Sequence, residues 1–175
     1  MSNWLPTGVA TFAALDFETA DRHSDSACAI GLARVEAGAV VQVVHRHIRP
    51  PRNSFEHSWV HGITWEHVCA APTFAELWPE ISELLKGCEF LCAHNAGFER
   101  RVLTTCLGAA GIAMPSQPIH CTVQLARRTW ALPRHNLPSV CTHLGIHLRH
   151  HDAASDAEAC ARIVLAAARQ AEGSP

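Results

Sequence analysis

The sequence predicts an α/β domain in which helices flank a central mixed five-stranded sheet. Three observations lead to this fold class. The unbroken apolar run at 12–15 is typical of a strand that is buried on both faces of a sheet. Two more apolar stretches follow it, joined by a tight turn, and helical and strand patterns then alternate along the chain. The 175 residues, 48% of them hydrophobic, suit one globular domain over 1–175, with its core at about 9–170.

The first three predicted strands are consecutive in the chain. The central strand lies within 11–20, and the stretches 27–35 and 39–48 form a hairpin around the turn Glu36-Ala-Gly. Such a hairpin continues the sheet in the antiparallel sense. Two prolines end the hairpin, and a loop region is predicted over 52–72.

Helices and short strands alternate in the remainder of the chain. Thr73 is the predicted N-cap of the first long helix, and Glu76, three residues further on, completes a capping box. The later elements are predicted as a strand over 90–93, a helix over about 96–110, a short strand within 115–120, helices over 122–130 and 136–143, and a last helix over about 152–170.

Two of these helices turn a carboxylate toward the core. At 100° per residue, Glu99 falls in the middle of the apolar arc of its helix, and Asp156 falls within the inward arc of the last helix. Burying a charge is costly, so a carboxylate in this position needs a partner. A metal ion would be such a partner, and a water-exposed gap in the core is the alternative for Glu99.

The central strand ends in two further carboxylates, Asp16 and Glu18. Residues two apart on a strand share a face, so these groups lie roughly 6–7 Å apart along the chain and repel each other. A bound cation offsets such repulsion, and ligation by oxygen alone suits Mg²⁺ or Mn²⁺. The alternative is that one carboxylate caps the next turn while the other is solvated.

A histidine, His151, lies five residues before Asp156, in the loop at the start of the last helix. Four carboxylates around two cations, with a neutral histidine that takes a proton from water, suit two-metal hydrolysis of a phosphodiester. The predicted metal ligands are therefore Asp16, Glu18, Glu99 and Asp156.

Composition limits the other classes of function. No apolar segment reaches the roughly 20 residues of a membrane span, and the N-terminus does not resemble a signal peptide, so a cytoplasmic protein is expected. Eight cysteines without a Cys-x-x-Cys pair favour reduced thiols, with a zinc site as the alternative. The formal charge is −2, and arginines cluster at 46/49/52, at 127/128/134 and at 149. Each cluster suits either phosphate contacts or a solvated surface.

The motifs that carry these residues resemble those of one nuclease family. In chain order they are Leu15-Asp16-Phe17-Glu18-Thr19, then Ala93-His94-Asn95-Ala96-Gly97-Phe98-Glu99, then His151 with Asp156, with His61-Gly-Ile-Thr and Ala71-Pro-Thr-Phe between the first two. Over roughly residues 11–168 the chain resembles the DnaQ-like, or DEDDh, 3′-to-5′ exonucleases, and among them the exonuclease X-like and polymerase III epsilon-subunit-like members. The resemblance implies the ribonuclease H-like fold. The spacing of His151 implies the histidine branch of the superfamily.

The resemblance also implies a role for each site residue. Asp16, Glu18, Asp156 and Glu99 would bind two divalent cations, Mg²⁺ or Mn²⁺, and would act in catalysis with His151 as general base. His150 is the less suitable neighbour on spacing. Contacts to the terminal nucleotide are implied for Phe17, Thr19, Glu56, His61, Asn95 and Phe98.

Glu99 departs from the family pattern, which has aspartate at this position. The extra methylene moves the carboxylate by about 1.3–1.5 Å, and a displacement of this size affects catalysis. Because Mn²⁺ tolerates imperfect geometry better than Mg²⁺, the sequence predicts activity with a preference for Mn²⁺.

The resemblance implies hydrolysis of single-stranded or frayed nucleic-acid ends, with DNA favoured, to nucleoside 5′-monophosphates, and a role in DNA proofreading or repair. One alternative is a nucleic-acid-binding module that has lost turnover through Glu99. Another is a phosphodiesterase acting on short oligonucleotides. The choice between DNA and RNA, a homodimer and association with a polymerase all stay open.

Overall fold

A computed structural model describes residue 4 and residues 10–173, and its centre is a mixed five-stranded sheet in the order β3-β2-β1-β4-β5. The central strand β1 pairs with β2 in the antiparallel sense and with β4 in the parallel sense. β3 is antiparallel to β2, and β5 is parallel to β4. The sheet confirms the predicted arrangement, and its strands are β1 (Phe12–Thr19), β2 (Ala27–Glu36), β3 (Ala39–His47), β4 (Phe90–Ala93) and β5 (Ile119–Cys121).

The helices are α1 (Ser58–His61), α2 (Trp65–Val68), α3 (Phe74–Leu85), α4 (Ala96–Ala109), α5 (Thr122–Thr129), α6 (Leu137–Leu144) and α7 (Ala153–Glu172). The two four-residue helices α1 and α2 lie in the segment that the sequence predicts to be a loop. A single helical turn is too short to show a hydrophobic period, so the sequence pattern does not reveal them. None of the helices in this described part is long and apolar enough to cross a membrane. The predicted domain limits, 1–175, extend over 1–3, 5–9 and 174–175, which lie outside the described residues.

Two local predictions are confirmed in detail. Ala37 and Gly38 both have positive φ, at 48° and 78°, as a two-residue hairpin turn requires. At the start of α3, the amide of Thr73 donates to Oε2 of Glu76 at 2.8 Å, while the amide of Glu76 donates to Oγ1 of Thr73 at 3.4 Å. This reciprocal pair is the capping box that the sequence indicates.

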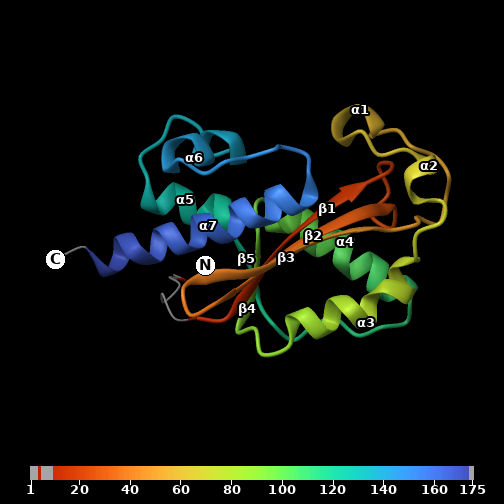
Figure 1. Cartoon of the computed structure of the whole chain (residues 1–175), viewed down its shortest axis with the longest axis horizontal. Coiled ribbons are helices and arrows are strands. Elements are labelled where there is room, and N and C mark those ends of the chain that lie inside the picture. Colours follow the sequence, from red (N-terminus) through yellow and green to blue (C-terminus); the bar gives the residue numbers. More distant parts are fainter. Residues whose placement is uncertain (1–3, 5–9, 174–175) are drawn as a thin grey trace.

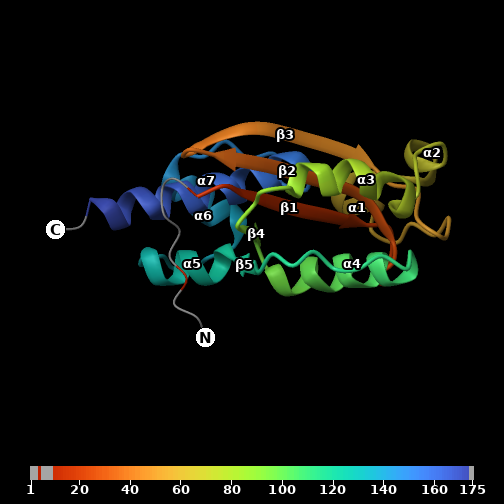
Figure 2. The ribbon, with the colours of Figure 1, turned by 90° about the horizontal axis from the view of Figure 1, so that it is seen from below.

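The sheet separates two hydrophobic cores (Figures 1 and 2). One core contains α5, α6 and α7, and the other contains α3 and α4. Along β1, Phe12 and Ala14 belong to the first core, while Ala13 and Leu15 belong to the second. The same alternation places the side chains of Asp16 and Glu18 on the face that α7 covers. In Figure 1 the end of β1, the start of α7 and α1 lie together, far from the C-terminal end of α7.

The helix α7 begins directly against the sheet, and Gly31 allows this close approach. Gly31 pairs with Asp16 in the ladder between β1 and β2. A Cβ at this position would overlap the carbonyl group of Ala153, the first residue of α7. The absence of a side chain at Gly31 therefore lets the first turn of α7, which carries Asp156, lie beside Asp16.

Candidate active site

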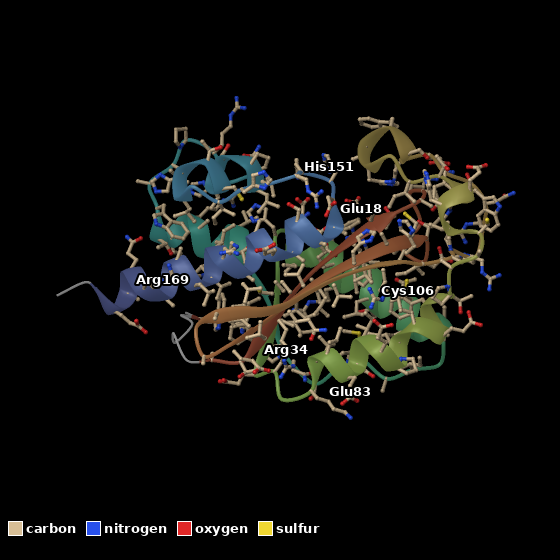
Figure 3. The ribbon with its side chains drawn as sticks, viewed as in Figure 1. Glu18, Arg34, Glu83, Cys106, His151 and Arg169 are labelled. Carbon is tan, nitrogen blue, oxygen red and sulfur yellow. The ribbon has the colours of Figure 1, made fainter. Side chains whose placement is uncertain are left out.

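Three carboxylates meet where β1 ends and α7 begins. Asp16 and Glu18 come from β1, and Asp156 comes from the first turn of α7. One oxygen of each lies within 4.8 Å of the other two. Glu18 and Asp156 are buried, and Asp16 is partly buried. Figure 3 shows Glu18 near His151 at this junction. The structure thus brings together three of the four carboxylates that the sequence analysis proposed as metal ligands.

The fourth carboxylate, Glu99, lies in the first turn of α4 and is only 3% exposed, so its predicted inward orientation is confirmed. β4 pairs with β1 only as far as Ala14, which leaves the amide of Phe17 without a partner from β4. Oε2 of Glu99 accepts a hydrogen bond from this amide at 3.0 Å. Glu99 lines the same cleft as the other three carboxylates but does not belong to the close group.

All four carboxyl groups resist ionisation. Burial, followed by the neighbouring charges of Glu99, Asp156 and Glu18, raises the pKa of Asp16 well above its ordinary value. Burial and the charges of Asp156 and Asp152 raise the pKa of Glu18 to about 8. Burial also raises the pKa of Glu99 and that of Asp156. A bound cation would remove this penalty, because it stabilises the ionised form of each group.

The hydrogen bonds of Asp156 also fit a cation. Its Oδ2 accepts from the backbone amide of His151 at 3.1 Å and from Nδ1 of His150 at 3.0 Å. Its Oδ1 is buried and has no hydrogen-bond partner among the described residues. Buried polar atoms are almost always paired, so an orphaned carboxylate oxygen beside two further carboxylates indicates a place for a metal ion. Asp16, Glu18 and Asp156 offer oxygen ligands, which suit Mg²⁺ or Mn²⁺.

Both histidines at the start of α7 belong to the site. The rings of His150 and His151 stack with their centroids 3.8 Å apart. His151 has a φ of 68°, which is rare for a residue with a side chain and is typical of functional sites. Partial burial and the charge of His150 lower the pKa of His151, which favours the neutral form of its ring. The sequence analysis did not anticipate the direct contact of His150 with Asp156.

The carboxylates line a cleft with a volume of about 400 Å³. One wall is made of side chains from α1 and its N-cap residue His57, and the remaining lining includes the carboxylates with His150 and His151. The lining residues are Asp16, Phe17, Glu18, Thr19, His57, Trp59, Val60, His61, Phe98, Glu99, His150, His151 and Asp156. Of the predicted nucleotide contacts, Phe17, Thr19, His61 and Phe98 line this cleft, and Asn95 lines the groove beside it. Glu56 is exposed and lines neither cavity.

The short helix α1 is tied to the end of β1. The carbonyl oxygen of Thr19 accepts from Nδ1 of His57 at 3.1 Å and from Nε2 of His61 at 3.2 Å. The amide of Ile63 donates to Nδ1 of His61 at 3.0 Å, which fixes the proton of this ring on Nε2. These bonds hold α1 beside the cleft.

Sequence reasoning missed three residues of this wall: His57, Trp59 and Val60. Trp59 is 85% exposed although it is the largest apolar side chain of the wall. An exposed tryptophan in a polar loop, two residues before His61, was the signal that could have indicated it.

A mixed sheet of this order, with an acidic cluster at the end of its central strand, is an arrangement that suits a domain able to bind divalent cations. The sequence model of one family, described as exonuclease (RNase T), matches residues 13–164. The chain therefore belongs to this exonuclease family, which confirms the resemblance to exonucleases that the motifs indicate.

Curated relatives agree with this assignment. The chain is 33% identical over 162 residues to the PolC-type DNA polymerase III of Thermotoga maritima, an alignment that covers 90% of this chain and 12% of that protein. It is 30% identical over 170 residues to the epsilon subunit of DNA polymerase III of Pasteurella multocida, covering 86% of this chain and 65% of the subunit. The chain thus spans about an eighth of the PolC-type proteins and about two thirds of the epsilon subunit.

Solved structures share the fold. Exonuclease X in complex with 5′ overhanging duplex DNA matches with a TM-score of 0.75 at 22% identity, over 93% of this chain and 94% of that one. The nuclease domain of 3′hExo, a DEDDh family member bound to rAMP, matches with a TM-score of 0.78 at 16% identity, over 94% of both chains. The predicted ribonuclease H-like fold is confirmed by these matches.

Proposed function

We propose that the domain is a metal-dependent 3′-to-5′ exonuclease that releases nucleoside 5′-monophosphates from single-stranded or frayed ends. The observation that carries this proposal is the close group of Asp16, Glu18 and Asp156, with the unpaired Oδ1 of Asp156, at the base of an open cleft. Membership of the exonuclease family supports the same reaction.

Asp16, Glu18 and Asp156 would hold the metal, and Glu99 would contribute to a second cation site from the same cleft. Two bound Mg²⁺ or Mn²⁺ ions would supply Lewis-acid stabilisation of the phosphate oxygens and would lower the pKa of the attacking water. The hydrogen bonds of Asp156 with His150 and with the amide of His151 would keep this carboxylate in place.

His151 is the proposed general base. Partial burial lowers its pKa and favours the neutral form of its ring, so it can take the proton of the attacking water. The water oxygen forms a bond to phosphorus, the bond from phosphorus to the 3′-oxygen of the preceding nucleotide breaks, and that oxygen takes up a proton from solvent water, while His151 later returns its proton to the solvent. His151 lies in the cleft with the carboxylates, where such a water would be positioned.

The wall of the cleft is proposed to hold the terminal nucleotide. Phe98 and Trp59 offer flat apolar surfaces for the base, and Phe17 and Thr19 lie beside the carboxylates, where the sugar would sit. Stacking of this kind tolerates any base, which suits an exonuclease without sequence preference. The contacts of Glu56 and Asn95 to the nucleotide stay predictions.

DNA is the proposed substrate, and proofreading or repair the proposed role. Two similarities support this: the two curated relatives described above are DNA polymerase III proteins, and the exonuclease X structure contains DNA. The rAMP in the 3′hExo structure is the reason to test RNA in parallel. The family resemblance also suggests two hypotheses, that the domain associates with a polymerase and that it forms a homodimer.

The test is a gel assay with a 5′-labelled single-stranded DNA and its RNA counterpart, each in Mg²⁺, in Mn²⁺ and in EDTA. We expect a ladder that shortens from the 3′ end, that depends on the metal, and that is absent in Asp16→Ala. No cleavage in either metal by the folded protein would instead support the nucleic-acid-binding module. Faster turnover of dinucleotides than of longer chains would support the short-oligonucleotide phosphodiesterase.

A further inference from the structure

A second groove adjoins two of the same carboxylates and is otherwise lined mostly by different residues. Its volume is about 560 Å³, which is within the range of ligand-binding sites. It shares Asp16, His150 and Asp156 with the catalytic cleft. The other residues that line it are His94, Asn95, Cys121, Val123, Gln124, Arg127, His135, Asn136 and Leu137. The acidic cluster therefore lies where two cavities meet, rather than at the end of one.

The composition of this groove suits an anion. Its only carboxylates are the two that it shares with the catalytic cleft, and the remainder of its lining contains amides, histidines and one arginine, Arg127. Arg127 is exposed on α5 and makes no ion pair or side-chain hydrogen bond with another described residue.

The other arginine clusters differ in this respect. Arg46 pairs with Glu80, Arg52 pairs with Asp21 and Asp25, and Arg149 pairs with Asp152. Arg127 thus lines the groove without forming an ion pair with another described residue.

The segment between α5 and α6 lines the groove, and a partly buried histidine, His94, holds this segment. Nε2 of His94 donates to the carbonyl oxygen of His135 at 2.9 Å, and Nδ1 of His94 lies 2.9 Å from Oγ1 of Thr122. Burial lowers the pKa of His94 to about 4, so this bridge keeps one protonation state across neutral pH. Nε2 of His135 also donates to the carbonyl oxygen of Trp130 at 3.1 Å. The groove is therefore pre-formed.

The position of the two cavities sets the direction of a bound strand. On the proposed function, the terminal nucleoside occupies the cleft beside Trp59 and Phe98, and the scissile phosphate lies at the carboxylates. The remaining strand must leave the carboxylates on another side, and the second groove is the cavity that opens there. We propose that this groove binds the nucleotides on the 5′ side of the scissile bond, with Arg127 contacting a phosphate upstream of it.

This inference rests on the proposed function and narrows its substrate to a polynucleotide chain rather than a single nucleotide ester. Arg127 is a substrate-binding residue in this scheme, and its contribution appears only with substrates that have an upstream phosphate. The guanidinium group suits such a contact because it donates two parallel hydrogen bonds to a phosphate.

The test compares Arg127→Ala with Arg128→Ala on two substrates. Arg128 is the matched control, because it is the next residue of α5, donates to the carbonyl oxygen of Trp4 at 3.0 Å and does not line the groove. The substrates are a single-stranded DNA 12-mer and the p-nitrophenyl ester of thymidine 5′-monophosphate, which has no upstream phosphate. We expect Arg127→Ala to lower kcat/KM for the 12-mer about tenfold, mainly through KM, and to leave the ester unchanged.

A salt titration gives a second readout that does not need turnover. The affinity for the labelled 12-mer, measured by fluorescence anisotropy in EDTA, should fall with salt concentration. Loss of one phosphate contact should make the slope of log affinity against log salt shallower by about 0.7 in Arg127→Ala, and by nothing in Arg128→Ala.

The outcomes separate the two proposals. If Arg127→Ala lowers kcat/KM equally for the 12-mer and the ester, or changes neither KM nor the salt slope, the groove does not have the proposed role. The proposed exonuclease activity would be unaffected by that result. If the wild type cleaves neither substrate, the proposed function fails, and the salt slope alone decides whether the groove binds nucleic acid.

Discussion

Two adjacent histidines at the start of α7 have different surroundings, and we expect them to have different functions. His150 donates to Oδ2 of Asp156 through Nδ1, so its ring is hydrogen-bonded to a proposed metal ligand. His151 reaches the same oxygen only through its backbone amide, which leaves its imidazole free for a water molecule. The unusual φ of His151 turns the chain between the two rings. Sequence spacing selected His151 as the base, but it could not show that His150 positions the carboxylate.

The first prediction separates these roles. His151→Ala should lower kcat about 10²- to 10⁴-fold with little change in the metal concentration needed for half-maximal rate, because it removes only a base. His150→Ala should mainly raise that metal concentration, because it loosens Asp156. Rates measured across a Mn²⁺ titration check both variants. A larger loss of kcat in His150→Ala than in His151→Ala would reassign the base.

Glu99 accepts a hydrogen bond from the backbone and also lines the cleft that contains the other carboxylates. Its longer side chain brings Oε2 to the amide of Phe17, an amide that β4 leaves without a partner. Shortening it to the aspartate of the family would therefore place the carboxylate at the family distance but would leave a buried amide unpaired. The sequence predicted the displaced carboxylate, and only the structure shows what the extra methylene reaches.

The second prediction tests both effects of the longer Glu99 side chain, on stability and on the choice of metal. Glu99→Asp should lower the free energy of unfolding by about 1–3 kcal/mol, because the amide of Phe17 loses its acceptor. The same variant should reduce the preference for Mn²⁺ over Mg²⁺, by about tenfold in the ratio of rates. Glu99→Gln is the matched control, since it keeps an acceptor for Phe17 but removes the charge, and it should be stable but slow. Urea unfolding and rates in each metal are the measurements. A wild type equally active in Mg²⁺ alone would contradict the premise.

At the scale of elements, the site depends on how closely α7 approaches the sheet. Gly31 of β2 pairs with Asp16 and leaves room for the carbonyl group of Ala153. Further along, α7 presents small buried residues such as Ala157, Cys160 and Ala161 to the sheet. Asp156 reaches Asp16 because the helix axis lies close to the strands at this end.

The third prediction tests whether the close packing of α7 against β2 is needed for the site. Gly31→Ala should lower the free energy of unfolding by about 1–3 kcal/mol and should weaken Mn²⁺ binding, because the new methyl group pushes the first turn of α7 away from β1. Gly108→Ala is the matched control, since it lies on the exposed face of α4, where a Cβ would meet nothing. That control should raise stability by about 0.5–1 kcal/mol. Urea unfolding and calorimetric titration of Mn²⁺ distinguish them; unchanged Mn²⁺ binding in Gly31→Ala would refute the mechanism.

The long elements were predictable because each shows its own period. The wheel of α4 placed Glu99 inside, and the capping box at Thr73 fixed the start of α3. The turn between β2 and β3 was equally clear from its glycine. Neither α1 nor the groove beside Asn95 could be predicted in this way. Both depend on contacts between segments far apart in the sequence, such as those of His61 with Thr19 and of His94 with His135.

At the scale of the whole molecule, mutual repulsion and burial of carboxylates at one site should destabilise the metal-free protein. Four carboxyl groups share the end of β1, and the pKa of each is raised first by burial. A group whose pKa is raised in the folded state stabilises the fold while it is protonated. For Glu18 this contribution is complete below its ordinary value of 4.5 and is lost as the pH rises through about 8.

The fourth prediction follows from that sign. In EDTA, the unfolding temperature should fall as the pH rises from about 5 to 8.5, and saturating Mn²⁺ should reverse most of this fall because it binds the ionised carboxylates. The gain in unfolding temperature from Mn²⁺ should therefore be larger at pH 8 than at pH 5. Circular dichroism melts at both pH values provide the measurement, with Asp16→Asn as a variant that should show a shallower dependence. A metal effect that does not change with pH would count against the raised pKa values.

The bonds that tie α1 to β1 have a consequence for the kinetics of the enzyme. Thr19, whose carbonyl oxygen accepts hydrogen bonds from His57 and His61, directly follows Glu18, a proposed metal ligand. The helix α1, which would contact a base, and the carboxylates Asp16 and Glu18 are therefore held by the same strand, β1. Free and loaded forms should superimpose closely, with no lid to close before each cut or to open after it. The pace of successive cuts would then be set by how fast the strand advances through the site.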